Sequence, residues 1–281
     1  GIDGQNLVQL TDGPDDDLEP TYCPDGSIVF CSSRCRRFVN CWYTRVAVLY
    51  RCDADGNNVR ALSSNNDHDN TPWVLSDGRI LYMRWEYVDR SQVHFHHLWT
   101  MNPDGTGQTV FYGNMHGGIA MLDAKPIPGT DKVVASFSPG HGRPEHLGHV
   151  AIVDPRAGPD NQGAARQITK RPEWKDPYAF SEECFLVARR DGLHVMDGQG
   201  NNELCYQLSE EDRQKWECHE PRPLTYRPLE RVIPERTHLA KSTGRLVLEN
   251  IYHGRKMAAV APGTIKKLLV LKQVPKPVNH S

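Results

Sequence analysis

The sequence predicts an all-β protein, a β-propeller of four-stranded antiparallel blades. One observation is an internal repeat, in which a glycine in a turn resembling D-x-D-G is followed six residues later by an apolar or aromatic residue. The repeat occurs at Gly4 to Leu10, Gly56 to Leu62, Gly105 to Phe111 and Gly200 to Tyr206. The other is that Asp-Gly pairs separate short β-rich runs, a strong hairpin signal because a type I′ turn needs positive φ at both central residues.

A proline-led hairpin forms the inner half of each predicted blade. Residues 20–30 (PTYCPDGSIVF) and 72–82 (PWVLSDGRILY) begin 52 residues apart, as do the turns at Gly4 and Gly56. Residues 126–134 and 177–187 are weaker copies that keep a turn but lose the Asp-Gly pair. Two hairpins in each period of about 50 residues make four strands, which is typical of a propeller blade.

The strands of a blade follow one another from the channel outward. Innermost strands are expected near 20–23, 72–75, 121–127, 177–181 and 222–227. Third strands are expected at 46–52, 97–102 and 150–154, and fourth strands end near Leu10, Leu62, Phe111, Ile168 and Tyr206.

About five blades are expected in a single β-propeller domain over 1–281. The blade repeats lie near 12–62, 63–111, 112–169, 170–206 and 207–281 with strand 7–10. The last blade would combine strands 222–227, 245–251 and 265–271 with the N-terminal strand. Two arrangements stay open: strand 7–10 pairs with 265–271 and closes the ring, or the chain is excised from a larger propeller.

Charge and hydropathy exclude two classes of partner. The chain has 33 Lys and Arg against 35 Asp and Glu, a net charge of -2, so no overall field attracts nucleic acid or anionic lipid. No apolar run approaches the roughly 20 residues that span a bilayer, so membrane insertion is not expected. The eight cysteines include no C-x-x-C pair, and their disulfide pairing is left open.

Propeller topology places the longer, polar connections on one face, here called the loop face. The connections between blades, and those between second and third strands, open there, and function concentrates on such loops. They cover residues 15–17, 31–43, 67–69, 86–96, 114–116 and 139–146.

Three histidines of the loop face, His116, His141 and His146, are candidate metal ligands, because imidazole is the commonest metal ligand in proteins. The alternative is that these rings bond to backbone carbonyls within the loops. Zinc is the ion expected for the histidines. Calcium would fit the acidic run 15–17, which is otherwise a solvated loop.

Charged and aromatic residues end one predicted inner strand. Arg84, Glu86, Tyr87 and Asp89 are candidate binding residues for a polar site near the central channel. The alternative is a buried ion pair between Arg84 and a carboxylate.

Several strings support a family resemblance. They are CSSRC at 31–35, LYR at 49–51, DGRILYMRWEYVD at 77–89, NPDGT at 102–106, PIPG at 126–129 and GTIK at 263–266. Together they resemble the propeller region of hydrazine synthase alpha-subunit-like proteins, and the proline-led hairpins resemble TolB-type propeller repeats. The resemblance implies a large, exported, periplasmic protein with haem only in a neighbouring domain. It also implies a cytochrome c-type domain or subunit as partner, and Cys41 and His68 as residues near that haem or a zinc ion.

Two functions remain open from the sequence. The first is a non-catalytic binding or docking domain that positions a haem domain and contributes loops to a shared site. The second is an enzyme, a propeller-type polysaccharide lyase or hydrolase acting through His, Arg and Tyr of the loop face.

Overall fold

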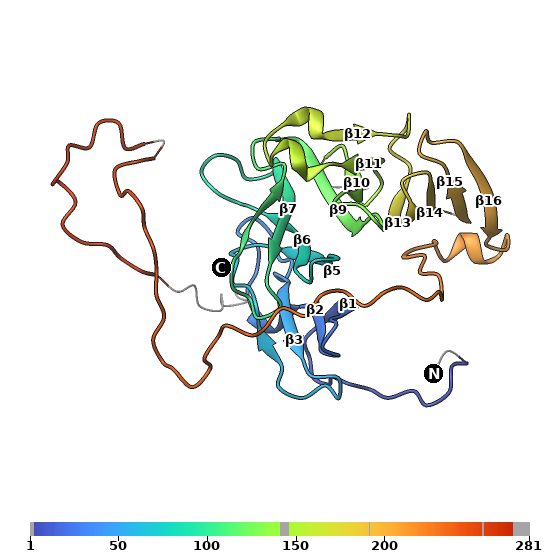
Figure 1. Ribbon diagram of the computed structural model, residues 1–281, viewed down its shortest axis with the longest axis horizontal. Helices are drawn as coiled ribbons and strands as arrows, with labels where there is room; N and C mark the ends of the chain where they lie inside the picture. Colours follow the sequence, from blue (N-terminus) through green and yellow to red (C-terminus); the bar gives the residue numbers. More distant parts are fainter. Residues whose placement is uncertain (1–2, 141–145, 191, 255, 272–281) are drawn as a thin grey trace.

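Sixteen β-strands and no α-helix occur in the part of the chain that the computed structural model describes, residues 3–140, 146–190, 192–254 and 256–271. The strands form four consecutive groups of four, here called units 1 to 4 (Figure 1). Unit 1 contains β1 (Asp17–Tyr22), β2 (Ile28–Ser32), β3 (Val48–Cys52) and β4 (Arg60–Ala61), and unit 2 contains β5 (Asp69–Val74), β6 (Ile80–Trp85), β7 (Phe95–Met101) and β8 (Thr109–Tyr112). Unit 3 contains β9 (Ile119–Pro126), β10 (Val133–Ser138), β11 (His149–Val153) and β12 (Ala165–Gln167), and unit 4 contains β13 (Lys175–Ser181), β14 (Cys184–Arg189), β15 (Gly192–Met196) and β16 (Asn202–Gln207). Four short 3-10 turns are η1 (Ser33–Cys35), η2 (Pro155–Ala157), η3 (Gln162–Ala164) and η4 (Asp212–Gln214).

Within each unit the strands are antiparallel and pair in sequence order. Units 2 and 3 are also joined by two parallel pairs between β7 and β9, Phe95 with Ile119 and His96 with Ala120. The all-β, antiparallel prediction is therefore confirmed for the described residues.

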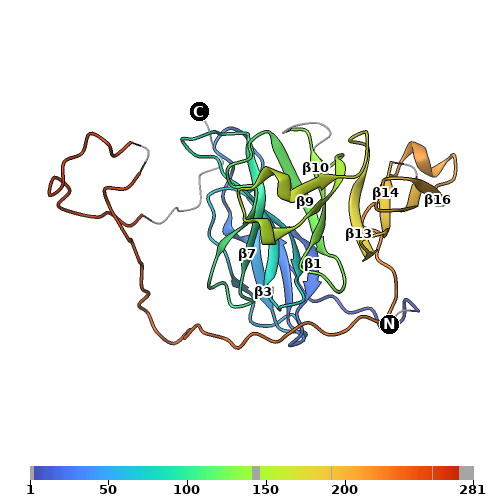
Figure 2. The same ribbon diagram turned by 45° about the horizontal axis from the view of Figure 1, so that its top comes forward.

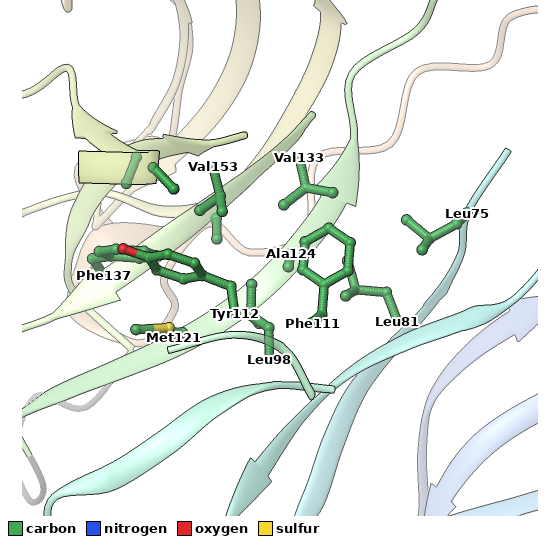
Figure 3. Packing of buried hydrophobic residues seen from close by; sticks show 13 residues of the cluster. Leu75, Leu81, Leu98, Phe111, Tyr112, Met121, Ala124, Val133, Phe137 and Val153 are labelled. Carbon is green, nitrogen blue, oxygen red and sulfur yellow. The ribbon is translucent and has the colours of Figure 1, made fainter. Parts of the chain in front are cut away.

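Most of the core lies between neighbouring units rather than inside one of them. Leu81, Leu98 and Phe111 of unit 2 pack with Met121 and Phe137 of unit 3 (Figure 3). Similar clusters join units 1 and 2 and units 3 and 4. Every residue of β10 is buried, because a strand between packed faces has no solvent side. The apolar runs of the second strands follow from this arrangement.

The repeated glycines make the units fit closely. Gly56, Gly105 and Gly200 have φ of +83°, +87° and +86°. A Cβ on each would lie 2.1, 2.6 and 2.1 Å from a backbone oxygen at the end of the preceding repeat, namely that of Leu10, Leu62 and Ile168 respectively. Only glycine provides both the positive φ and the close approach.

The strands expected over 222–227, 245–251 and 265–271, and at 7–10, are wrong for this structure: no strand occurs in the described residues before β1 or after β16. The expected pairing of 7–10 with 265–271 is therefore not found. Pro223 removes a ladder donor from the first of these stretches, and Pro221 and Pro228 flank it. The later stretches leave Leu246 and Val247 exposed (75% and 88%), so they bury no apolar face.

The segment after β16 runs past β1 and β2 and then extends away from the sheets (Figure 2). Side chains rather than a β-ladder attach its first part. The Arg222 guanidinium donates to the Pro20 carbonyl at 3.1 Å, and Arg60 pairs with Glu235 at 2.9 Å. This crossing brings residues 217–223 against the inner strands of units 1 and 4.

Candidate functional site

A pocket of about 280 Å³ lies on the loop face. It is lined by Val39, Cys41, Trp42, Thr44, His68, Asn70, Met83, Trp85, His96, Ala120, Leu122 and His146. Loops 31–43 and 67–69, together with His146, supply outer residues, and the starts or ends of β5, β6, β7 and β9 form its floor. We call it the loop-face pocket.

The buried Trp85 ring is one of the residues that line this pocket. Its ring centroid lies 5.6 Å from that of His68, which is stacked on it, and 5.2 Å from that of His96, which meets it edge-on. The Trp85 Nε1 donates to the Gln92 carbonyl at 3.0 Å, so the indole is held by polar and apolar contacts together. The two imidazoles therefore pack against the same indole, His68 stacked on it and His96 edge-on.

Loop 31–43 carries two exposed aromatic side chains, of which Trp42 lines the pocket and Tyr43 lies next to Trp42. A bridge between Phe38 and Arg45 and the buried Val39 hold its base. At its tip, Trp42 and Tyr43 are 69% and 58% exposed, with ring centroids 6.0 Å apart. Large exposed aromatic groups beside a pocket are typical of a binding surface.

The electrostatics beside the pocket favour neutral groups. Burial raises the pKa of Asp67 to about 6, although its carboxylate accepts the Tyr87 N–H at 3.1 Å. Burial also lowers the pKa of His97 to about 3, with Arg90 and Arg84 adding to the effect. The pKa of Tyr87 is raised, first by burial and then by the Cys41 thiol, with which its hydroxyl shares a hydrogen bond.

Asp67→Asn is expected to stabilise the protein increasingly as the pH rises from about 4 to above 6. Because the folded-state pKa of about 6 exceeds the ordinary aspartate pKa of 3.8, the folded protein binds the extra proton in this window and loses stability as the proton leaves. Urea unfolding of both proteins at pH 4 and pH 7.5 measures the difference. Asp55→Asn is the control, since hydrogen bonds from Asn57 lower the pKa of Asp55, and it should gain no stability with rising pH.

The structure brings three of the sequence-predicted residues together and places others elsewhere. Cys41, His68 and His146 line the loop-face pocket. His116 is buried, with its Nε2 at 3.0 Å from the Asp160 carbonyl and its ring against Tyr112. His141 lies outside the described residues. A zinc site made by His116, His141 and His146 stays a prediction.

The group from 84 to 89 is spread over several environments. Arg84 makes the buried ion pair, with two bonds to Asp69 at 2.8 and 3.2 Å. Glu86 pairs with Arg90 at 2.6 Å, and Asp89 pairs with Lys256 at 2.6 Å on the surface. Of the four residues, Tyr87 is the one that approaches the pocket, through Trp85 at 5.8 Å between ring centroids and through the Cys41 thiol.

Sequence reasoning missed Asn70, Trp85 and His96 as pocket residues. All three lie in strands, where side chains alternate between faces. The long polar loops could be recognised in the sequence as candidate binding segments, whereas the strand ends beneath them could not. Among the described residues the Asn70 Oδ1 is buried without a hydrogen-bond partner.

Comparison with protein-family models and with curated proteins finds no match. Solved structures share the fold. Against hydrazine synthase from Kuenenia stuttgartiensis the TM-score is 0.62 at 18% identity, over 78% of this chain and 36% of that one. A putative TolB from Agrobacterium tumefaciens (15% identity, 68% of this chain and 65% of that one) and a gluconolactonase from Xanthomonas campestris (16%, 68% and 62%) are weaker, each with a TM-score of 0.49. The chain thus spans less than two thirds of each, and the likeness is one of fold, with propeller-like neighbours.

The described residues contain no helix of the length and hydrophobicity needed to cross a bilayer.

Proposed function

We propose that this chain is a non-catalytic binding or docking β-propeller domain of a larger exported, haem-bearing protein similar to the hydrazine synthase alpha subunit. Units 1 to 4 are its blades, its setting is periplasmic, and the loop face receives a cytochrome c-type domain or subunit. The observation that carries the proposal is the loop-face pocket, in which Cys41, His68 and His146 come together from three loops.

The chemistry of the pocket supports a haem-bearing partner. The exposed Trp42 and Tyr43 offer flat apolar area, which suits the edge of a macrocycle and the apolar rim of its domain. The Cys41 thiol and the His68 imidazole are soft and borderline donors beside that area. A polar group of the partner would satisfy the buried Asn70 Oδ1, which removes the cost of leaving an acceptor without a donor.

The test uses the full chain and a haem c peptide, a haem attached covalently to a short peptide that contains C-x-x-C-H. Binding at the loop face should quench tryptophan fluorescence, and Trp42→Ala should weaken the affinity by about thirtyfold, the effect of losing a hot-spot tryptophan. Cys41→Ser should weaken it less.

Matched variants distinguish haem-peptide binding at the loop-face pocket from non-specific binding elsewhere on the surface. Trp216 is exposed to a similar extent (66%), and Cys205 is also exposed, so Trp216→Ala and Cys205→Ser should bind like the unmodified chain. No quenching at all, or equal weakening by Trp42→Ala and Trp216→Ala, contradicts the proposal.

A further inference from the structure

A second group of residues, unrelated to the loop-face pocket, repeats around the inner edge of the four units. Its members have a left-handed backbone, with φ between 44° and 55°: Glu19, Thr71, Asp123, Asp176 and Glu220. The first four interrupt the register of β1, β5, β9 and β13 as bulges. Because residues other than glycine seldom adopt positive φ, a repeated set of five is a built feature of the fold.

Hydrogen bonds link these positions in two groups, Glu19 with Thr71 and Asp123, and Asp176 with Glu220. The Thr71 N–H donates to Glu19 Oε2 at 2.7 Å, and the Asp123 N–H donates to Thr71 Oγ1 at 3.3 Å. The Glu220 N–H donates to Asp176 Oδ2 at 2.9 Å. Each of these side chains therefore fixes the backbone of the next position, and the polar groups converge at the centre.

We propose that Asp123, Asp176 and Glu220 bind one hard divalent cation at this centre, with calcium as the best fit. A carboxylate oxygen from each lies within 4.8 Å of the other two. Oxygens that bind one calcium at about 2.4 Å are separated by no more than about 4.8 Å, so the spacing fits a single ion. Carboxylate donors favour calcium, magnesium or manganese over zinc.

An unsatisfied buried oxygen points independently to a ligand. Asp123 is 5% exposed, and its Oδ2 has no hydrogen-bond partner among the described residues. A buried carboxylate oxygen without a partner is costly, and a cation would remove that cost. Asp123 also lines a small pocket of about 10 Å³ together with Glu19, Thr71 and Glu220. This volume is about what one water-sized particle needs.

The local charge is suited to a divalent ion. Four carboxyl groups face the centre, from Glu19, Asp123, Asp176 and Glu220, against the cations Lys125 and Arg222. With every carboxyl ionised, the group therefore carries two negative charges. Lys175 does not change this balance, because its Nζ pairs with Glu217 at 2.7 Å.

The carboxyl groups of this site repel one another. Without a cation, burial and then the nearby Asp176 raise the pKa of Asp123, with Glu220 and Glu19 adding to the effect and Lys125 opposing it. The pKa of Asp176 is lowered, because hydrogen bonds from the His219 ring and the Glu220 N–H outweigh its burial.

The experiment measures calcium binding to the full chain after treatment with a chelator. Calorimetric titration with CaCl₂ should show one site per chain, and the melting temperature should rise by about 5 °C or more at a hundredfold excess over Kd. Asp123→Asn should weaken binding at least tenfold. This variant should keep the circular dichroism spectrum of the calcium-free unmodified protein, which excludes misfolding as the cause.

Asp16→Asn, in the acidic run 15–17, is the matched control and should keep full calcium binding. The proposal is overturned by three results: no calcium-dependent shift in the unmodified chain, a shift that persists in Asp123→Asn, or a preference for ZnCl₂ over CaCl₂. None of these results depends on haem peptide binding, so this proposal and the proposed function fail separately.

Discussion

Gly200→Ala is expected to cost about 4 kcal/mol or more of unfolding free energy, the range of the most damaging single substitutions. The residue has φ +86°, where an added Cβ costs about 1–2 kcal/mol by itself. The Cβ would also lie 2.1 Å from the Ile168 oxygen and 3.0 Å from its carbon, both backbone atoms of unit 3. The steric clash is removed only if unit 4 moves away from unit 3.

Gly26→Ala is the matched control, because Gly26 has the same φ of +86° and a Cβ added there would meet nothing within 4 Å. It should lower the unfolding free energy only by the cost of a Cβ at positive φ, about 1–2 kcal/mol. Urea unfolding midpoints of the two variants measure the difference. Equal losses would mean that close packing between units does not require the repeated glycine.

Breaking the ion pair between Asp69 and Arg84 is expected to cost about 3–5 kcal/mol from either side. The Asp69 side chain is fully buried and that of Arg84 is 12% exposed. The guanidinium also stacks over the Trp99 ring at 4.3 Å. Asp69→Leu leaves a buried cation without its anion, and Arg84→Met leaves a buried anion without its cation.

The double variant Asp69→Leu with Arg84→Met provides the test of this explanation. Replacing a buried pair by apolar side chains removes both uncompensated charges, so the double loss should be well below the sum of the single losses. Chemical unfolding of the three variants gives the coupling. Additive losses would show that the two charges act independently.

Much of the fold could be predicted because its signals are local. The Asp-Gly turns at Gly26 and Gly78 and the glycine at 200 depend on positive φ, which a short stretch of sequence reveals. The prediction of strands in the C-terminal stretches was wrong because β-prone residues form a strand only beside an open strand edge. Leu246 and Val247 have the right side chains, but no such edge lies beside them in the described residues.

The sites depend on contacts between distant segments and could be predicted less well. Propeller topology predicted that Cys41, His68 and His146 lie on one face, and in the structure they line one pocket. The central carboxylates were missed, although a signal exists. Glu19, Thr71, Asp176 and Glu220 each precede a proline, so a polar residue before the repeated proline marks the position. Asp123 precedes Ala124 and lacks this mark.

Carbene footprinting of the full chain with and without the haem c peptide tests the loop face as a binding surface most directly. The peptide should reduce labelling of Trp42 and Tyr43 at the pocket rim, while Trp216, which is exposed to a similar extent, should be labelled equally in both samples. Unchanged labelling at Trp42 and Tyr43, or protection confined to residues outside the loop face, would contradict the proposed function.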